Sequence, residues 1–352
     1  MTTQAATRMA TEMAEQPDAC RRTLEALVPL RAEIVARYAG RRRVLFAARG
    51  SSDNAAIYGR YLLETHAGVS GALVSPSVAT HYGARLDLSD ALVVSVSQSG
   101  ATEEIVATQD WARECGAATI AVANVADSPL VEGADLALVT QAGPEVAVPA
   151  TKSYLAQLVA MAVLGTALAP DPDALDDDLA RVAGEVERLL SADVAAAVDV
   201  LTSTSYAVVS GRGLMMGTAL ETALKLEETC LRPVRGYSYA DFRHGPISVV
   251  ADGTAAVLVS AADGPMVTPM TELARDLSAR GAQLIGIGGD AAFADALDVA
   301  LPGPDLPETL APIGSIVTSQ VLVERLAHAL GLDPDNPRGL AKVTATEPPK
   351  EQ

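Results

Sequence analysis

The sequence predicts an α/β protein built from two tandem parallel sheets, each flanked by helices. Short apolar runs bounded by Gly and Ser alternate with longer helical patterns, as strands and crossover helices do in such sheets. We expect strands at 43–48, 91–97, 118–123 and 135–140 in the first half, and at 206–211, 255–260, 283–288 and 297–302 in the second.

An internal repeat indicates that the two sheets are copies of one unit. "AARGSS" resembles "VSGRGL", "ADLALV" resembles "LDVALP", and "SYLAQLVAMAV" resembles "IVTSQVLVERL". These alignments pair Gly50 with Gly213, Asp135 with Asp298 and Gln157 with Gln320, and each pair is 163 positions apart. A constant offset is typical of tandem duplication.

The domain boundaries follow from this repeat. The segment 168–185 has the Pro and Asp density of a linker. We expect a helical leader at 1–40, a first domain at 41–170, a second domain at 171–332 and a C-terminal tail at 333–352.

Composition restricts the class of protein. The chain has 352 residues, is 49% hydrophobic and carries a formal net charge of −18, which argues against nucleic acid or an anionic membrane as a partner. Its three cysteines are widely spaced and form no CxxC pair, as expected in a reducing compartment. The N-terminus lacks a signal-peptide core, and no apolar run reaches the roughly 18 residues of a membrane span. We therefore expect a cytoplasmic protein.

The polar stretch "SQSGAT" follows the strand expected at 91–97. A simple helix cap would need only one hydroxyl. A phosphate site would use several hydroxyl groups together with backbone N–H groups at the helix N-terminus. A second hydroxyl-rich strand end, "ARGSSDN" with Ser52, favours the phosphate site, because ligands bind beyond the carboxyl ends of parallel strands.

Charged groups suited to chemistry occur in the second half. Glu221, Lys225 and Glu228 fall on one face of a helix expected at about 214–230. Such a stripe is either a salt-bridged surface or, because the helix is otherwise apolar, one wall of a cleft. His244 precedes Gly245 and Pro246, which predicts a turn. Lys342 lies in the tail, which is either disordered or docked onto the body, where a lysine could engage a sugar carbonyl.

These motifs carry a resemblance to a known family. In the order "SQSGAT", "ATKSY", "ALKLEE", "HGP" and "PRGLAK", the chain resembles the tandem sugar isomerase (SIS) domain proteins over residues 20–347. It is similar to the isomerase half of glutamine–fructose-6-phosphate amidotransferase and to SIS-type glucosamine-6-phosphate deaminases. The resemblance implies two flavodoxin-like SIS domains.

The resemblance also implies roles for single residues. Glu228 matches the base that moves a proton between C1 and C2, and His244 the ring-opening histidine, which the family takes from the neighbouring subunit of a homodimer. Lys342 matches the lysine near C2, and Lys225 a supporting lysine. The implied substrate-binding residues are Ser52, Ser97, Gln98, Ser99, Thr102, Val148 and Ala150.

The chain departs from the synthase in ways that bear on its reaction. Ala150 replaces a serine and Arg49 a cysteine, and both stretches look more like those of the deaminases. The synthase also carries a large glutaminase domain with a nucleophilic N-terminal cysteine, whereas about 40 residues precede the first expected strand here and position 2 is Thr2. We therefore expect no glutamine-dependent ammonia production.

The leading hypothesis is an enzyme that converts glucosamine 6-phosphate to fructose 6-phosphate and ammonia. A related SIS enzyme would act on galactosamine 6-phosphate or a fructosamine 6-phosphate adduct. The third possibility is a non-catalytic sugar-phosphate sensor, which would need a DNA-binding segment but no base. The sequence has no clustered His and Cys ligands and no GxGxxG, so we expect neither a metal nor a redox cofactor.

Overall fold

The computed structural model describes residues 6–342 of the chain. Its packing divides the chain into two compact units. Among the described residues, the β1–β5 unit contains residues 19–144, 156–175 and 340–342, and the β6–β10 unit contains residues 6–18, 145–155 and 176–339. The domain boundaries expected from the sequence, 41–170 and 171–332, remain predictions. Thr2 and the tail beyond Lys342 lie outside the described residues.

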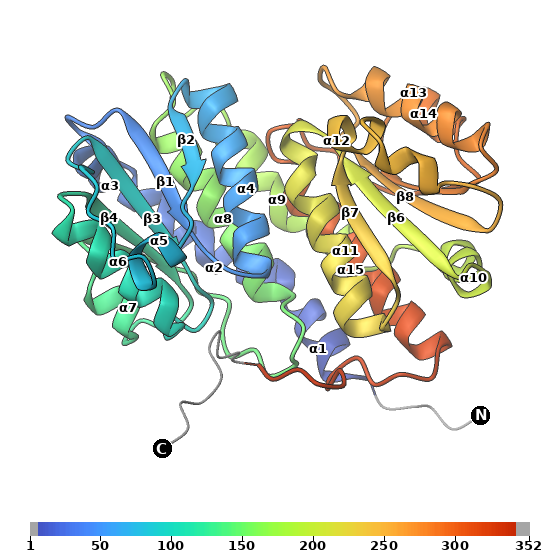
Figure 1. The fold of residues 1–352 in the computed structure, drawn as a ribbon, viewed down its shortest axis with the longest axis horizontal. Helices are drawn as coiled ribbons and strands as arrows, with labels where there is room; N and C mark the ends of the chain where they lie inside the picture. The colour runs from blue at the N-terminus through green and yellow to red at the C-terminus, as the bar shows by residue number, and fades with distance from the viewer. Residues whose placement is uncertain (1–5, 343–352) are drawn as a thin grey trace. The chain divides into compact units, whose positions relative to one another are not determined.

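The β1–β5 unit is built on a parallel five-stranded sheet with the order β2-β1-β3-β4-β5 (Figure 1). Its strands are β1 (Arg43–Ala47), β2 (Ser70–Leu73), β3 (Ala91–Val96), β4 (Ala118–Ala123) and β5 (Leu136–Val139). Every residue of β3 and β4 is buried, as expected for central parallel strands with helices on both faces. This order is that of the flavodoxin-like doubly wound fold, which places a crevice where β1 and β3 end.

Helices cover both faces of this sheet. They are α2 (Gln16–Leu27), α3 (Arg31–Tyr38), α4 (Ser51–Leu62), α5 (Ser77–Thr80), α6 (Glu103–Glu114), α7 (Pro129–Glu132) and α8 (Lys152–Ala167), with the first residues of α2 and α8 belonging to the other unit. In Figure 1, α4 and α8 run side by side. They approach closely because both carry glycine at the contact: a Cβ on Gly59 would lie 2.6 Å from Met161 Sδ, and one on Gly165 would lie 2.5 Å from a Leu62 methyl carbon.

The β6–β10 unit repeats the same topology. Its parallel strands have the order β10-β9-β8-β6-β7. From β7 to β10, this order matches that of the first sheet from β2 to β5. The strands are β6 (Tyr206–Gly211), β7 (Val234–Ser238), β8 (Thr254–Ser260), β9 (Gln283–Gly288) and β10 (Val299–Leu301). The helices are α1 (Arg8–Ala14), α9 (Asp176–Leu189), α10 (Ala195–Ser203), α11 (Met216–Cys230), α12 (Tyr239–Arg243), α13 (Val267–Ser278), α14 (Ala291–Ala294) and α15 (Ala311–Ala329).

Alternating strand residues of this unit face two separate cores. Val209 and Val257 belong to the core that includes residues of α10, α11 and α15. Val208 and Leu258, their neighbours along the strands, belong to the core that includes residues of α13 and Phe293 of α14. Successive side chains of a strand point to opposite faces, so the apolar runs of the sequence supply both cores at once.

The structure confirms the predicted fold class. Equivalent bonds also support the predicted repeat: Asp135 Oδ2 accepts from Thr119 N at 2.8 Å, and Asp298 Oδ2 accepts from Leu284 N at 2.7 Å. Each aspartate thereby ties the segment before the last strand of its sheet to the strand beside it.

The sequence patterns missed some elements. β2 and β7 were not expected, because both are edge strands that carry Gly and polar residues instead of an apolar run. The segment 168–185 is a linker only as far as residue 175, because α9 begins at Asp176 and buries Leu179 and Val182.

Candidate functional site

The loop after β3 brings hydroxyl groups together at the carboxyl edge of the first sheet. The Ser97 hydroxyl lies 3.0 Å from that of Thr102, and Ser97 is 4% exposed. Gln98 and Ser99 are half-buried, and Ser99 Oγ accepts a hydrogen bond from Ala101 N at 3.2 Å. The four predicted phosphate ligands are therefore neighbours on one short loop.

Gly100 fixes the path of this loop. Its φ is +62°, and a Cβ there would lie 2.0 Å from Ser128 Oγ, so a side chain is excluded both by conformation and by space. Its carbonyl accepts a hydrogen bond from Leu130 N at 3.0 Å, which anchors the loop to the start of α7.

Thr102 is the N-cap residue of α6, but its side chain makes no capping hydrogen bond. Its hydroxyl is directed to Ser97 instead. The N-terminus of α6 therefore keeps the positive potential that attracts anions, beside a loop rich in hydroxyl donors.

Ser52 lies in the first turn of α4, which follows the neighbouring strand β1. It is 7% exposed, and its Oγ accepts a hydrogen bond from Gln157 Nε2 at 3.0 Å. Since this bond occupies Ser52 as an acceptor, its own proton is available to another group. Gln157, on α8, was noticed in the sequence only through its pairing with Gln320.

In the β6–β10 unit, α11 carries a buried cluster of charge. Lys225 Nζ lies 3.2 Å from a carboxylate oxygen of Glu221 and also forms an ion pair with Glu228. Burial lowers the pKa of Lys225, but the two carboxylates outweigh it and the net shift is upward. The lysine is therefore a permanent cation at neutral pH.

The members of this cluster differ in exposure. The side chains of Glu221 and Lys225 are 0% and 1% exposed, whereas that of Glu228 is 18% exposed. Of the three, Glu228 is thus the group that a small molecule can reach, and it is paired with the buried Lys225. The stripe is not the salt-bridged surface that was the alternative interpretation.

His244 and Lys342 are the other two predicted catalytic residues. His244 is the exposed residue that follows α12, and Gly245 comes next with a φ of +131°, so the predicted turn is present. Lys342 is half-buried and is the last described residue. The contacts described above join Lys225 to Glu228; the roles of His244 and Lys342 remain predictions.

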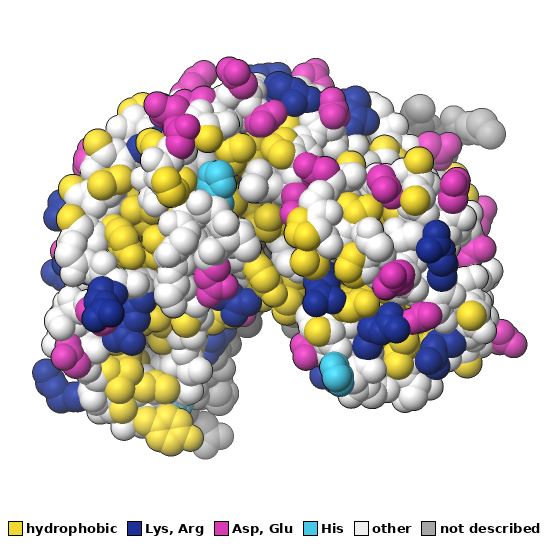
Figure 2. Space-filling view, turned by 90° about the horizontal axis from the view of Figure 1, so that it is seen from above, with side chains coloured by type: hydrophobic (Ala, Val, Ile, Leu, Met, Phe, Trp, Pro, Cys, Tyr) yellow, Lys and Arg dark blue, Asp and Glu magenta, His cyan; other side chains and the backbone are white. Residues whose placement is uncertain are grey.

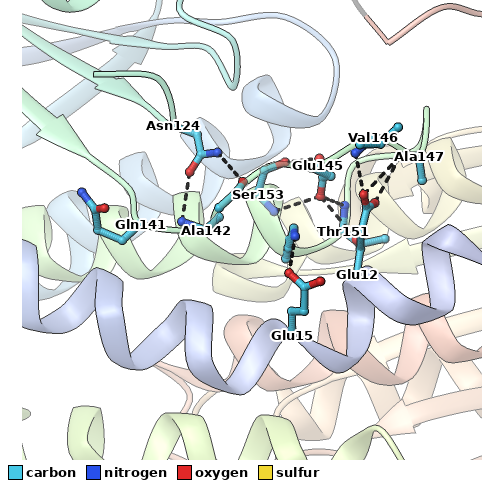
Figure 3. A network of polar contacts seen from close by, with 12 residues as sticks. Glu12, Glu15, Asn124, Gln141, Ala142, Glu145, Val146, Ala147, Thr151 and Ser153 are labelled. Carbon is cyan, nitrogen blue, oxygen red and sulfur yellow. Dashed lines mark hydrogen bonds and ion pairs between the residues drawn. The ribbon is translucent and has the colours of Figure 1, made fainter. Parts of the chain in front are cut away.

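Val148 and Ala150 lie on the segment before α8, and two buried carboxylates shape that segment (Figure 3). Glu145 accepts hydrogen bonds from the backbone and side chains of both Thr151 and Ser153. Glu12 of α1 accepts from the backbone N–H groups of residues 146 and 147, and its burial raises its pKa. No sequence pattern predicted a role for either glutamate, because neither has the spacing of a helix cap.

The part of the chain that the structure describes contains neither a metal-binding cluster nor a membrane-spanning helix. Within residues 6–342, no group of three or more His, Cys, Asp or Glu side chains is arranged to hold a metal ion. No helix in that range is long and apolar enough to cross a membrane. On the face drawn in Figure 2, Asp and Glu side chains are spread among other residues, as in a solvated acidic surface.

The fold and these sites define the class of protein. The SIS domain model matches residues 38–167 and 201–329, which is most of the chain. The chain therefore belongs to the SIS domain family and contains two SIS domains.

Particular relatives follow from sequence comparison. The chain is 32% identical over 349 residues to the glutamine–fructose-6-phosphate aminotransferase of Thermococcus kodakarensis, covering 96% of this chain and 58% of that protein. It is 31% identical over 363 residues to the same enzyme of Pseudomonas aeruginosa, covering 96% and 59% respectively. The chain thus spans little more than half the length of these relatives.

Solved structures resemble this chain over nearly its whole length. A protein of Silicibacter pomeroyi DSS-3, provisionally described as a phosphosugar isomerase, superposes with a TM-score of 0.86 at 32% identity, covering 94% of this chain and 100% of that one. The glucosamine-6-phosphate deaminase of Thermotoga maritima superposes with a TM-score of 0.77 at 22% identity, covering 96% and 100%. The second likeness concerns the fold alone.

Proposed function

We propose that this protein is an amino-sugar phosphate isomerase that converts glucosamine 6-phosphate to fructose 6-phosphate and ammonia. One observation carries the proposal: Glu228 is a partly exposed carboxylate that forms an ion pair with the buried cation of Lys225. An accessible carboxylate beside a fixed cation is suited to abstract a proton from carbon.

The reaction needs three operations. His244 opens the pyranose ring, and the open chain carries an aldehyde at C1 and an amine at C2. Glu228 takes the proton from C2 and returns it to C1 through an enaminol, while Lys342 places positive charge near the reacting oxygen. The product is fructose imine 6-phosphate, and its hydrolysis by water gives fructose 6-phosphate and ammonia.

The phosphate ester is assigned to the loop of Ser97, Gln98, Ser99 and Thr102, with Ser52 on the sugar side. Several hydroxyl donors beside an uncapped helix N-terminus support this assignment. Val148 and Ala150 are assigned to the sugar, on a segment that Glu145 holds in place. The proposed enzyme is a homodimer in the cytoplasm, with His244 supplied by the partner subunit.

The test follows ammonia release from glucosamine 6-phosphate and galactosamine 6-phosphate, and release of the attached amine from a fructosamine 6-phosphate adduct. We expect the first to react fastest and Glu228→Gln to lower its kcat by at least about 100-fold, the usual contribution of a general base. Glu227→Gln is the matched control, because Glu227 is the exposed neighbour of Glu228 on α11 and forms no ion pair with Lys225 in the described cluster.

The outcomes separate the competing functions. Faster turnover of another sugar would reassign the substrate within the family. Undiminished turnover by Glu228→Gln would remove that residue from the mechanism. Tight binding of the phosphate esters with no turnover of any of them would replace the enzyme with a sugar-phosphate sensor.

A further inference from the structure

Arg49 is the second residue after the end of β1. It forms a bidentate ion pair with Glu104 at the start of α6. Its Nε and Nη2 lie 2.9 Å from Glu104 Oε2 and Oε1, respectively. Its remaining nitrogen, Nη1, donates to Ala48 O at 3.3 Å. All three guanidinium nitrogens are therefore engaged by protein groups, next to the loop assigned to phosphate.

The charges around that loop oppose the binding of an anion. The two segments that flank the crevice, 48–54 and 97–104, contain three acids, Asp53, Glu103 and Glu104, and a single cation, Arg49. Burial raises the pKa of Asp53, while Arg49 acts in the opposite direction. Glu103 and Glu104 occupy the first turn of α6, where carboxylates compete with a bound phosphate for the helix dipole.

Of these acids, Glu104 is the one paired with Arg49. Its side chain is 9% exposed, so solvent screens it poorly, whereas that of Arg49 is 44% exposed. A two-point pair between planar groups holds the guanidinium in one place and cancels the carboxylate at short range. Without Arg49, a poorly screened negative charge would face the ligand.

We propose that Arg49 determines the affinity of this site for a phosphate ester by neutralising Glu104, and that it does so as a positioning residue, without itself binding the phosphate. The proposal rests on the proposed function, because it takes the Ser97–Thr102 loop as the phosphate site. It assigns a role to a position at which the chain departs from the synthase pattern.

The proposal predicts effects of opposite sign for the two partners. Arg49→Met exposes Glu104 and should weaken binding of a phosphate ester by about 3- to 10-fold, in the range of partly exposed charge pairs. Glu104→Gln removes the repelling charge and should tighten binding by a similar factor. The double variant restores the original charge balance and should bind nearly as the unmodified protein does.

The probe is glucitol 6-phosphate, an open-chain ester that cannot isomerise, titrated calorimetrically into the full chain at 50 and 300 mM salt. The single-variant effects should shrink at the higher salt, because Arg49 is accessible to screening ions. Arg43→Met and Asp90→Asn form the control pair: Arg43 begins the same strand, and its Nη2 lies 2.8 Å from Asp90 Oδ1 at the opposite edge of the sheet. These two should change the affinity by less than about 2-fold.

Other results would overturn the proposal in distinct ways. If the double variant binds as weakly as Arg49→Met, Arg49 contacts the phosphate directly. If both single variants weaken binding and lower the thermal midpoint equally, the pair is only structural. If none of the Arg49 and Glu104 variants changes the affinity, Ser99→Ala leaves it unchanged as well, and glucitol competes as well as its phosphate, then the phosphate site of the proposed function is wrong. If Ser99→Ala weakens binding while the Arg49 and Glu104 variants do not change it, only the present inference is refuted.

Discussion

At the scale of single residues, Lys225 combines complete burial with a permanent charge. Such a lysine is tolerated only where its charge is paired, because an isolated ion in the protein interior is strongly disfavoured. Glu221, fully buried one turn away, supplies that pairing, and Glu228 makes the second ion pair. The raised pKa of Lys225 means that its contribution to folding is fully present below the ordinary lysine pKa of 10.5 and is lost only as the pH rises through the higher folded value.

Replacing Lys225 by Met should destabilise the protein by about 3–5 kcal/mol at pH 7, because the buried carboxylate of Glu221 loses its salt-bridge partner. Chemical denaturation at pH 7 measures this.

The double variant Lys225→Met with Glu221→Gln is the control for that prediction. It removes both buried charges and should recover most of the stability at pH 7. A double variant that recovers none of the lost stability would show that packing, and not the buried carboxylate, is responsible.

At the scale of elements, polar contacts hold α9 against the segment that follows β10, although the sequence predicted that part of α9 belongs to a linker. Glu185 Oε2 accepts a hydrogen bond from Asp305 N at 2.7 Å, and Arg188 Nη2 donates to Gly303 O at 2.7 Å. Arg188 also donates to Glu185 Oε2 at 2.7 Å, so both side chains hold α9 against the segment that follows β10. The hydrogen bond from Arg188 is the main cause of the lowered pKa of Glu185, and the bond from Asp305 assists it against burial.

Glu185→Gln should therefore lower the free energy of unfolding by about 1 kcal/mol at neutral pH, the usual value of a charge-assisted surface contact. A depressed folded pKa gives stability that is present above the ordinary value of 4.5 and is lost as the pH falls through the folded value. The difference between variant and parent should accordingly vanish in strong acid, as urea titrations along a pH series would show.

Glu272→Gln on α13 provides the comparison, because Glu272 is an exposed helical glutamate of the same unit. It should leave the stability nearly unchanged at every pH. An effect of Glu185→Gln that stays constant down to strong acid would contradict the role assigned to its charge.

At the scale of the whole molecule, one architecture is used twice and its two copies have diverged at their strand ends. The hydroxyl-rich loop of Ser97 follows β3, whereas the equivalent position after β8 begins "SAADGP" and carries Asp263. The buried charge cluster occurs on α11, and the equivalent helix α4 contains Ser52. The two copies of the fold therefore carry different polar groups: the first has the hydroxyl-rich loop, and the second has the buried charge cluster.

We propose that the active protein is a homodimer in which each site combines Glu228 of one subunit with His244 of the other. Co-expression of inactive His244→Ala subunits with inactive Glu228→Gln subunits should then restore activity. Random pairing yields about one half hybrid dimers with one intact site of two, so about a quarter of the parental activity is expected.

The measurement is ammonia release, first from the mixture and then from hybrids purified through two different affinity tags, for which about half of the parental activity is expected because one site of two is intact. The control is a single chain that carries both substitutions and carries either of the two tags. Dimers of this double variant have no intact site and should remain inactive. Full activity of a monomer at the assay concentration would contradict shared sites.

The sequence by itself determined the fold class, because apolar runs, helical periodicity and the repeat at 163 positions are local or arithmetic properties of the chain. It also identified the loop of Ser97 and the helix of Lys225 as unusual. Only the tertiary structure decided that Lys225 is buried, that Gln157 contacts Ser52, that Glu145 holds the segment of Ala150, and that Arg49 is paired with Glu104. β2 and β7 escaped prediction for the same reason: an edge strand is specified by its partner in the sheet more than by its own residues. Burial and pairing join residues that are 55 or 105 positions apart, and no local pattern records such contacts.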